Sequence, residues 1–470
     1  MNTRTPTFRI HAQILRRISV SVCLVLCAGF QLSAATPETA PSIEWVASAG
    51  GPKNERTRSL SLDGEGNIFL TGEATDDVKF GDAIVKSAGG MDFFVAKLDP
   101  KGHFLWARMG GGSLIDRGYS VAADGGGGCY VTGHYQSADA DFSGTKLANR
   151  GDYDIFVAKY DREGKLAWIQ TAGGKGYDYG HGIAVDTRGD VIVTGAVVGD
   201  SDFGDVKIPN EPGSHIFCAK YHPDGKLVWV KVATGKAGGA GQAVVVDGKD
   251  AIYIGGDSYG SGEFGSKPLP AQKWTSSLVA KLSPEGEVLW IAQNPGEPSC
   301  LFHEIACDQE GRVWASGMFK GRMTAGSETF TSTGDKDNDA LLCHYDTDGK
   351  LLWSRVGQGP GVDYGLGVAT DGKGNSFLTG EFSETFKLGG EELHSRGSTD
   401  IYVAKFDEQG GLRWITQAGG DKGDNAYCMA CDAQGNLFLG GSFGGTAAFG
   451  DTTVTSAGGI DLYVAKLKAK

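Results

Sequence analysis

Short apolar stretches recur along the whole chain, and glycine and aspartate separate them. An example is the segment 67–71 (Asn-Ile-Phe-Leu-Thr), which follows Asp63 and ends at Gly72. Stretches of this length, rich in aromatic and β-branched residues, are typical of β-strands and leave no room for helices. Turns such as 161–165 (Asp-Arg-Glu-Gly-Lys) stand between them, and glycine supplies the positive φ that a tight hairpin needs. The pattern predicts an all-β chain of short strands joined by hairpins.

A unit of about 61 residues is repeated along the chain. Seven tryptophans are separated by 61, 62, 61, 61, 63 and 61 residues, and an aspartate that opens a turn recurs with the same period. An array of four-stranded all-β units predicts a seven-bladed β-propeller. The tryptophans are Trp45, Trp106, Trp168, Trp229, Trp290, Trp353 and Trp414, and the aspartates are Asp63, Asp124, Asp186, Asp247, Asp308, Asp371 and Asp432. Residues that occur in every repeat are expected to hold the blades together, and we interpret the aspartates as hairpin caps.

The strand before each of these aspartates alternates a small residue with a large one. Blades converge toward the axis of a propeller, so this pattern predicts the innermost strand of each blade. The small position, two residues before the aspartate, holds Ser61, Ala122, Ala184, Val245, Ala306, Ala369 and Ala430.

Both ends of the repeat array are incomplete. Residues 43–46 supply only a tryptophan strand, and residues 461–470 end the last repeat without one. We therefore expect the N-terminal strand to complete the seventh blade and close the ring, which removes two exposed sheet edges.

These features resemble the SBBP-type seven-bladed β-propeller repeats of secreted bacterial proteins, over about residues 42–470. The Asp-x-x-Gly-Lys-x-x-Trp turn at 161–168 also resembles the tryptophan-docking repeat of propellers of the pyrroloquinoline-quinone type. Both motifs are blade scaffolding shared by proteins with unrelated functions, so the resemblance implies a fold and no activity.

The N-terminus has a different composition from the repeats. Residues 1–35 combine four arginines, an apolar run at 18–30 and a small-residue cleavage site at 33–35, which predicts a secretory signal peptide. Residues 36–41 would be a linker, and residues 42–470 the propeller. No other apolar stretch is long enough to cross a membrane, so the mature chain is expected to have no transmembrane helix. The chain is accordingly expected to be secreted or periplasmic.

A lipoprotein is the alternative to a cleaved, unanchored chain. Cys27 would carry the lipid, but Leu26 stands before it, where the lipoprotein pattern requires a small side chain. An envelope-assembly scaffold of the propeller lipoprotein kind depends on that lipid.

The net charge of the chain indicates which classes of molecule it can bind. Removing residues 1–35 takes away four arginines and no carboxylate, so the net charge of −13 becomes −17. An acidic protein is a poor partner for nucleic acid. We expect a protein or a polysaccharide of the envelope or the extracellular space instead.

Seven cysteines lie outside the predicted signal peptide, and an odd number excludes complete pairing within one chain. Most stand where other repeats place small apolar residues, which favours buried thiols. A disulfide between Cys300 and Cys307 is the one pairing hypothesis. The cysteines are Cys129, Cys218, Cys300, Cys307, Cys343, Cys428 and Cys431.

Five repeats carry a second acid eight residues before the turn aspartate, in the glycine-rich connection between blades. A ring of such carboxylates could hold Ca²⁺ together with backbone carbonyls. The competing interpretation is that each acid accepts backbone N–H groups and fixes its own loop. No cofactor is required by either interpretation. The acids are Glu55, Asp116, Asp178, Asp363 and Asp424.

Departures from the repeat are the candidates for ligand binding. One position, five residues before the turn aspartate, varies in chemistry and is expected at the inner rim. It holds Arg58, Tyr119, His181, His303 and Tyr427.

Trp274 has no counterpart in the other repeats, and we expect it in the loop between the second and third strands of the fourth blade. There it would contact a sugar ring or a partner side chain, or else pack against its own loop.

No converging catalytic set is visible. Two G-x-S-x-G strings, at 256–260 and 440–444, follow predicted blade strands and reuse their repeated glycine, whereas a nucleophile elbow needs a strand-turn-helix setting. The sequence therefore favours a non-catalytic binding scaffold in the envelope or outside the cell. The alternative is a propeller enzyme that acts on a polysaccharide or a small ligand through its non-repeated loops.

Overall fold

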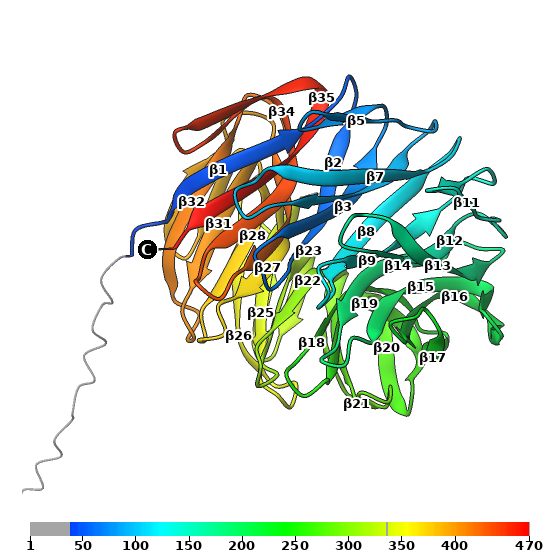
Figure 1. The fold of residues 1–470 in the computed structure, drawn as a ribbon. Coiled ribbons are helices and arrows are strands. Elements are labelled where there is room, and N and C mark those ends of the chain that lie inside the picture. The colour runs from blue at the N-terminus through cyan, green and yellow to red at the C-terminus, as the bar shows by residue number, and fades with distance from the viewer. Residues whose placement is uncertain (1–37, 335–336, 470) are drawn as a thin grey trace, which may run out of the picture. The chain divides into compact units, whose positions relative to one another are not determined.

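The computed structural model describes residues 38–334 and 337–469, and this part of the chain is built from β-strands with no helix. The strands form antiparallel groups of four, arranged around a central axis (Figure 1). The prediction of an all-β propeller is confirmed. The predicted signal peptide and most of the linker lie outside the described residues. In the part of the chain that is described, no helix has the length and apolar character to span a membrane.

Each blade begins with an inner strand, which pairs with a second strand. The inner strands are β2 (Glu55–Leu62), β8 (Asp116–Ala123), β14 (Tyr179–Val185), β18 (Gly238–Val246), β22 (Gly296–Cys307), β27 (Asp363–Thr370) and β33 (Asn425–Cys431). The second strands are β3 (Ile68–Ala74), β9 (Cys129–Tyr135), β15 (Val191–Phe203), β19 (Ile252–Phe264), β23 (Val313–Ala325), β28 (Ser376–Phe382) and β34 (Leu437–Phe449).

The third and fourth strands complete each blade toward its outer edge. The third strands are β6 (Asp92–Leu98), β12 (Asp154–Tyr160), β16 (Val206–Tyr221), β20 (Lys267–Leu282), β25 (Asn338–Tyr345), β31 (Asp400–Phe406) and β35 (Thr452–Lys468). The outer strands are β7 (Phe104–Gly111), β13 (Leu166–Gly174), β17 (Leu227–Gly235), β21 (Val288–Asn294), β26 (Leu351–Gly357), β32 (Leu412–Gly420) and β1 (Ser42–Ala49). Short strands in the connections are β4 (Val78–Phe80), β5 (Ala83–Val85), β10 (Asp141–Phe142), β11 (Thr145–Lys146), β24 (Glu328–Thr331), β29 (Thr385–Leu388) and β30 (Glu391–His394).

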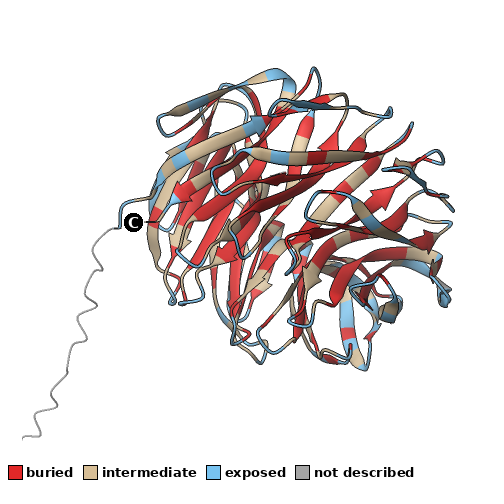
Figure 2. Ribbon diagram, viewed as in Figure 1, coloured by how far each residue is buried: buried red, intermediate tan, exposed pale blue. Residues whose placement is uncertain are grey.

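The inner strands contact one another in the cyclic order β2, β8, β14, β18, β22, β27, β33 and back to β2. Buried side chains follow the strands, and exposed ones gather at the connections (Figure 2). The hydrophobic core is divided accordingly. Cys428 and Phe438 of one blade, for example, pack in a cluster with Leu60 and Leu70 of the next. Each blade therefore depends on its two neighbours for burial of its faces.

The repeated tryptophans stand on the outer strands and join each blade to the next. Trp106 Nε1 donates a hydrogen bond to the backbone oxygen of Arg162, 2.9 Å away in the hairpin of the following blade. The turn glycine of that hairpin, Gly164, has a φ of +74°, and a Cβ at this position would lie 2.5 Å from the Trp106 ring. Glycine is thus required both by the turn and by the close approach of the indole.

The N-terminal strand closes the ring as the sequence predicts. Strand β1 pairs antiparallel with β35, with Val46 opposite Ala465 and Ala49 opposite Leu462 (Figure 1). Without β1, the edge of β35 would lie open to solvent, and Trp45 would no longer cover the turn of the next blade.

We expect deletion of residues 42–49 to lower the melting temperature of the protein by more than about 10 °C, because it removes a whole outer strand and one tryptophan tie. Thermal unfolding by circular dichroism measures this, with a chain that begins at residue 42 as the matched control. Equal melting temperatures for the two chains would contradict the closure argument.

Candidate functional site

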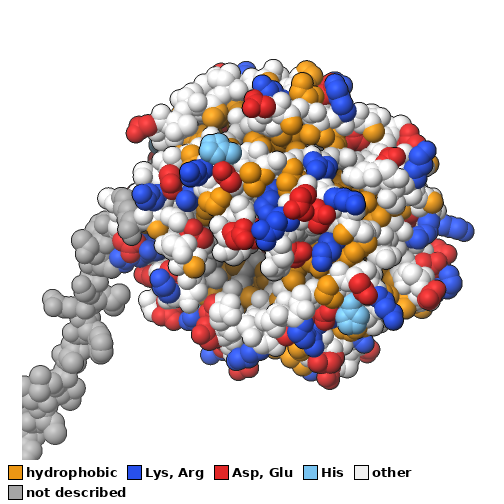
Figure 3. Space-filling model, in the orientation of Figure 1, with side chains coloured by type: hydrophobic (Ala, Val, Ile, Leu, Met, Phe, Trp, Pro, Cys, Tyr) orange, Lys and Arg blue, Asp and Glu red, His pale blue; other side chains and the backbone are white. Residues whose placement is uncertain are grey.

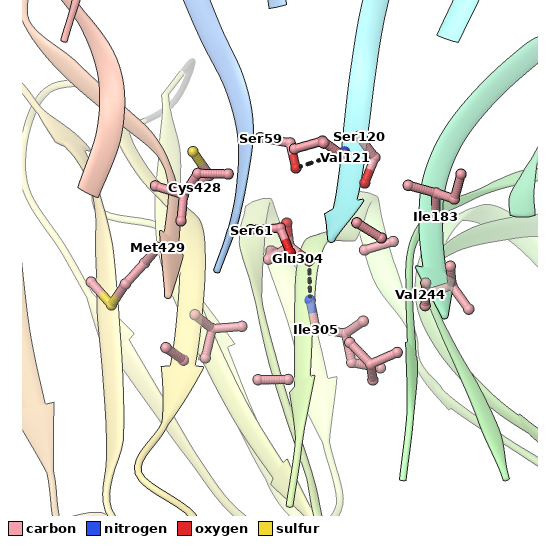
Figure 4. A pocket seen from close by; sticks show the side chains of 18 of the residues that line it. Ser59, Ser61, Ser120, Val121, Ile183, Val244, Glu304, Ile305, Cys428 and Met429 are labelled. Atoms are coloured by element: carbon pink, nitrogen blue, oxygen red, sulfur yellow. Dashed lines mark hydrogen bonds between the residues drawn. The ribbon is translucent and has the colours of Figure 1, made fainter. Parts of the chain in front are cut away.

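A cavity of about 520 Å³ lies where the inner strands of all the blades meet. Its middle is lined by one side chain from each of five inner strands, and most of these are small. Figure 4 shows Glu304 reaching into this space, with Cys428 and Met429 on one side and Ile183 and Val244 on the other. The lining residues at this level are Ser59, Ser120, Ala243, Glu304 and Cys428, so Glu304 is the one carboxylic acid among them. The other two inner strands have Gly182 and Gly367 at the same position.

Serine hydroxyls join the inner strands of the first two blades. Ser59 Oγ accepts a hydrogen bond from Val121 N at 3.2 Å (Figure 4). Ser61 Oγ accepts one from Ala123 N at 3.0 Å. These hydroxyls therefore tie neighbouring inner strands together in the wall of the channel.

Every inner strand contains a β-bulge at the same place, just above this level. Pairing with the second strand skips one residue, as at Arg58, which lies between the paired residues Thr57 and Ser59. A bulge turns its extra side chain away from the regular alternation of a strand. All seven bulged residues line the cavity, and they are Arg58, Tyr119, His181, Gln242, His303, Leu366 and Tyr427.

Five of these seven are the residues that the sequence identifies as inner-rim candidates, and the structure brings them together around one cavity. Gln242 and Leu366 complete the ring. Both stand five residues before a turn aspartate, so the repeat itself carried the signal that would have added them. The spacing identifies this position, but the bulge itself could not be predicted, because residues of different chemistry occupy the position from one repeat to the next.

Arg58 is held rigidly at the mouth of the channel. Its Nε and Nη2 donate to the two carboxylate oxygens of Glu73, at 2.8 and 2.7 Å. Its guanidinium lies over the rings of Tyr119 and Tyr427, 5.5 and 5.1 Å from their centroids. A bidentate ion pair between two aromatic faces fixes both the position and the plane of the guanidinium.

The two histidines of the ring are neutral at pH 7. Burial lowers the pKa of both His181 and His303 to about 4. Nδ1 of His181 and Nε2 of His303 have no hydrogen-bond partner among the described residues. These two nitrogens are buried polar atoms without a protein partner, beside the cavity that both histidines line.

The carboxyl groups near the channel are weak acids. Burial raises the pKa of Glu304 to about 7, and its Oε1 accepts a hydrogen bond from Ile305 N at 3.1 Å. Burial also raises the pKa of Asp257 to about 6 and that of Glu381 to about 7. Asp257 and Glu381 stand on second strands, at the position that Glu73 occupies in the first blade. Of these three acids only Glu304 lines the cavity, so the interior of the channel gains negative charge when Glu304 ionises near neutral pH.

Trp274 lies away from this ring. It belongs to strand β20, not to a loop, because β19 and β20 extend outward as a long hairpin. The expected loop position is wrong for that reason. The side chain is 40% exposed and does not line the cavity, and Lys273 Nζ lies 4.7 Å from its ring centroid.

The five second acids are fully buried in the connections between blades. Asp116 shows the pattern: its carboxylate accepts hydrogen bonds from Gly112 N at 2.8 Å, Gln136 N at 3.0 Å, Ser137 N at 3.2 Å and Ser137 Oγ at 2.6 Å. Gly51, Gly174 and Gly420 donate their N–H groups in the same way to the second acids of three other blades. These bonds favour the loop-fixing interpretation. In residues 38–334 and 337–469 no group of three or more metal-binding side chains occurs, and Ca²⁺ binding stays a hypothesis.

Each second acid also faces a carboxylate from the preceding blade. The pairs are Asp92 with Asp116, Asp154 with Asp178, Asp339 with Asp363, Asp400 with Asp424, and Asp461 with Glu55. At the other two junctions both acids are replaced, by His215 with Gly239 and by Ser276 with Cys300. Neither acid occurs without its partner.

The turn aspartates hold their own hairpins. Asp63 Oδ1 accepts hydrogen bonds from Glu65 N at 2.9 Å and Asn67 N at 2.8 Å. The other six aspartates make the same type of bond to backbone N–H groups two to four residues onward. Lys97 Nζ lies 3.6 Å from Asp63 Oδ2, so a buried charge is also balanced at this turn.

All seven cysteines of the described residues are free thiols. Cys300 and Cys307 stand near opposite ends of β22, paired with Phe319 and Val313 respectively. Seven residues of extended strand separate them by roughly 20 Å, far beyond the reach of a disulfide. The disulfide hypothesis for this pair is wrong.

We expect Glu304→Gln to be more stable than the wild type at pH 8, by about 1 to 3 kcal/mol, and equal to it near pH 4. An unfolded glutamate ionises near 4.5, whereas Glu304 keeps its proton up to about 7. The folded wild type therefore loses stability as the pH rises between these values, and glutamine cannot. Urea unfolding at both pH values measures the difference, and a difference that does not vary with pH would contradict a buried Glu304 carboxyl.

We expect Asp116→Ala to lower the free energy of unfolding by about 2 to 4 kcal/mol, because it leaves buried N–H and O–H donors without an acceptor. Asp139→Ala is the matched control. Asp139 is an exposed carboxylate that accepts from Ser113 in the same connection, and its loss should cost less than about 1 kcal/mol.

The same unfolding experiment tests the Ca²⁺ hypothesis. The loop-fixing interpretation expects equal stability in Ca²⁺ and in EDTA. A Ca²⁺-dependent gain in the wild type that Asp116→Ala abolishes would instead identify the connection as an ion site.

No protein-family model matches the chain. An uncharacterised WD repeat-containing protein of Acanthamoeba polyphaga mimivirus is 24% identical, over 72% of this chain and 31% of that protein. The chain thus spans about a third of the length of this relative.

Similar solved structures include a gluconolactonase of Xanthomonas campestris, with a TM-score of 0.36, 11% identity, and coverage of 93% of this chain and 99% of that one. A puromycin hydrolase has a TM-score of 0.43, 11% identity, and coverage of 88% and 57%. The assignment as a β-propeller rests on the strand topology of the structure itself, and membership of the SBBP-type repeats stays a prediction.

Proposed function

We propose that the protein is a non-catalytic binding module whose ligand enters the mouth of the central channel. One observation carries this proposal. The tryptophans and turn aspartates are identical in all the repeats, whereas the bulged position varies, and all its side chains face one cavity. A site built from the one variable inward-facing position is asymmetric, as a specific ligand site must be.

The contacts within the channel favour recognition over chemistry. Ser59 and Ser61 accept hydrogen bonds from the neighbouring strand, and they are not seen hydrogen-bonded to a histidine. Arg58 is occupied by Glu73 and stacked between tyrosines. Fixed aromatic faces and neutral ring nitrogens are well suited to holding a ligand in one orientation.

A second candidate function rests on Glu304. It is the one acid at the middle level of the channel, it follows His303 directly, and its pKa of about 7 suits proton transfer near neutral pH. On this alternative the protein is an enzyme that acts on a polysaccharide or a small ligand.

The location proposed for this activity is the periplasm or the outside of the cell. The predicted signal peptide at residues 1–35 supports export, and the net negative charge supports a partner other than nucleic acid. A protein or a polysaccharide of the envelope or the extracellular space fits both.

We expect the purified protein to retain a ligand from envelope or culture-medium fractions, and Tyr119→Ala to lose it. The tyrosine lines the channel and stacks on Arg58, so its removal opens one wall of the mouth. Tyr259→Ala is the matched control, because Tyr259 is an exposed tyrosine that does not line the cavity.

Mass spectrometry of the retained material, with melting curves to verify folding, gives the readout. Equal retention by all three proteins would overturn the channel as the binding site. Turnover of a retained sugar or small molecule by the wild type, lost in Glu304→Gln, would establish the enzyme instead.

A further inference from the structure

A row of aromatic side chains leads from the rim of the ring into the channel. We name it the aromatic strip: Tyr153, Tyr177, Tyr179, His181 and Tyr119. Ring centroids lie 5.4 Å apart for Tyr153 and Tyr177, 6.5 Å for Tyr177 and Tyr179, 5.4 Å for Tyr179 and His181, and 4.8 Å for His181 and Tyr119. No comparable chain of ring contacts is found at the channel mouth in the rest of the described residues.

The start of strand β14 supplies three rings of this row. Tyr177 lies just before the strand, Tyr179 is its first residue, and His181 is its bulged residue. The planes of Tyr177 and Tyr179 differ by 10°, and those of Tyr179 and His181 by 24°. The three rings therefore present nearly parallel faces.

The strip joins solvent to the cavity. Tyr177 is 46% exposed, whereas His181 and Tyr119 line the channel. Beyond Tyr119 the guanidinium of Arg58 and the ring of Tyr427 continue the row across the mouth. A ligand lying on the strip would thus reach from the outer face into the interior of the ring.

Two rings of the strip carry no charge at neutral pH. Burial lowers the pKa of His181 to about 4 and raises that of Tyr179 to about 12. His134, which packs 5.2 Å from Tyr119 and 5.1 Å from Tyr179, has both ring nitrogens buried without a partner among the described residues. The strip therefore combines aromatic rings with tyrosine hydroxyls, and the buried imidazole of His134 packs against it.

One cation lies beside the strip without a carboxylate partner. Arg117 precedes Tyr119 by two residues, and its charge acts on both Tyr179 and His134. Its Nε contacts Met91 Sδ at 3.1 Å, and no ion pair to an acidic side chain is found for it within the described part of the chain. Arg58, in contrast, is already paired with Glu73.

We propose that the aromatic strip is a subsite for a carbohydrate chain that carries carboxylate groups. This inference rests on the proposed binding function and names its ligand class. Sugar rings have flat C–H faces that pack on tyrosine rings, and their hydroxyls exchange hydrogen bonds with the tyrosine hydroxyls. The guanidinium of Arg117 is placed to receive a carboxylate of the chain.

The net negative charge of the protein does not attract an acidic polymer over long distances, so selection has to come from direct contacts. Charges of both signs are intermixed on the face seen in Figure 3, with no large patch of one sign. The placement of Arg117 beside the strip is therefore the feature that distinguishes an acidic sugar chain from a neutral one.

The test is isothermal titration calorimetry of the full protein with galacturonic acid hexamer and with cellohexaose, a neutral hexamer. We expect binding of the acidic hexamer, and roughly tenfold weaker binding for each of Tyr177→Ala, Tyr179→Ala and Arg117→Gln. Tyr259→Ala, which removes an exposed tyrosine outside the strip, should bind as the wild type does. Melting curves verify that each variant folds, and Tyr177 is exposed enough for its removal to be tolerated.

Absence of binding to the acidic hexamer would overturn the inference, and so would equal affinity for the neutral one. Binding that survives both tyrosine substitutions would also overturn it, because the contacts would then lie elsewhere. These failures are distinct from failure of the proposed function. If the protein binds a ligand that is not a sugar, and Tyr119→Ala loses it, the proposed binding function is supported and only the carbohydrate inference is overturned.

Discussion

The contact between an outer-strand tryptophan and the turn of the next blade is the interaction on which the ring depends, and six of the seven repeated tryptophans make it with a turn glycine. Trp106 lies against Gly164, where a Cβ would meet the indole, and donates a hydrogen bond to the same hairpin. A blade cannot bury its two faces alone, so its stability is a property of its junctions. The last junction requires β1 to pair with β35. The residues that recur in every blade therefore hold the junctions together, in addition to the contacts between inner strands.

The side chains that line the channel can vary because other residues hold the blades together. The turn aspartates and tryptophans satisfy the backbone and the junctions in every blade, whereas the bulged residue has no pairing duty. A substitution at Arg58 or His181 therefore changes the surface of the cavity without altering the ladder of hydrogen bonds around it. Side chains of different chemistry can therefore occupy the bulged position with little effect on the pairing of the strands.

The periodic sequence was sufficient to predict the propeller, the closing strand and five of the bulged residues, because each leaves a mark with a fixed spacing. The repeat spacing does not reveal how far an individual strand extends, so features that depend on strand length were not predicted. Trp274 was expected in a loop, but β19 and β20 extend outward and include it. Cys300 and Cys307 are close in sequence, but an extended strand separates them. The aromatic strip was missed because Tyr177 and Tyr153 belong to different repeats, and only the packing of blades brings them together.

The carboxylate pairs at the junctions are a further feature that depends on the packing of two blades. Asp92 and Asp116 are 24 residues apart in sequence and occur at separate positions of the repeat, yet each is present only where its partner is. If each acid served only its own loop, single losses would be expected. Their joint loss indicates that a second carboxylate in the junction changes the energy of the first. Burial and the neighbouring Asp178 raise the pKa of Asp154 to about 6, as such coupling requires. The acids thus belong to the junction between two blades and not to either blade alone.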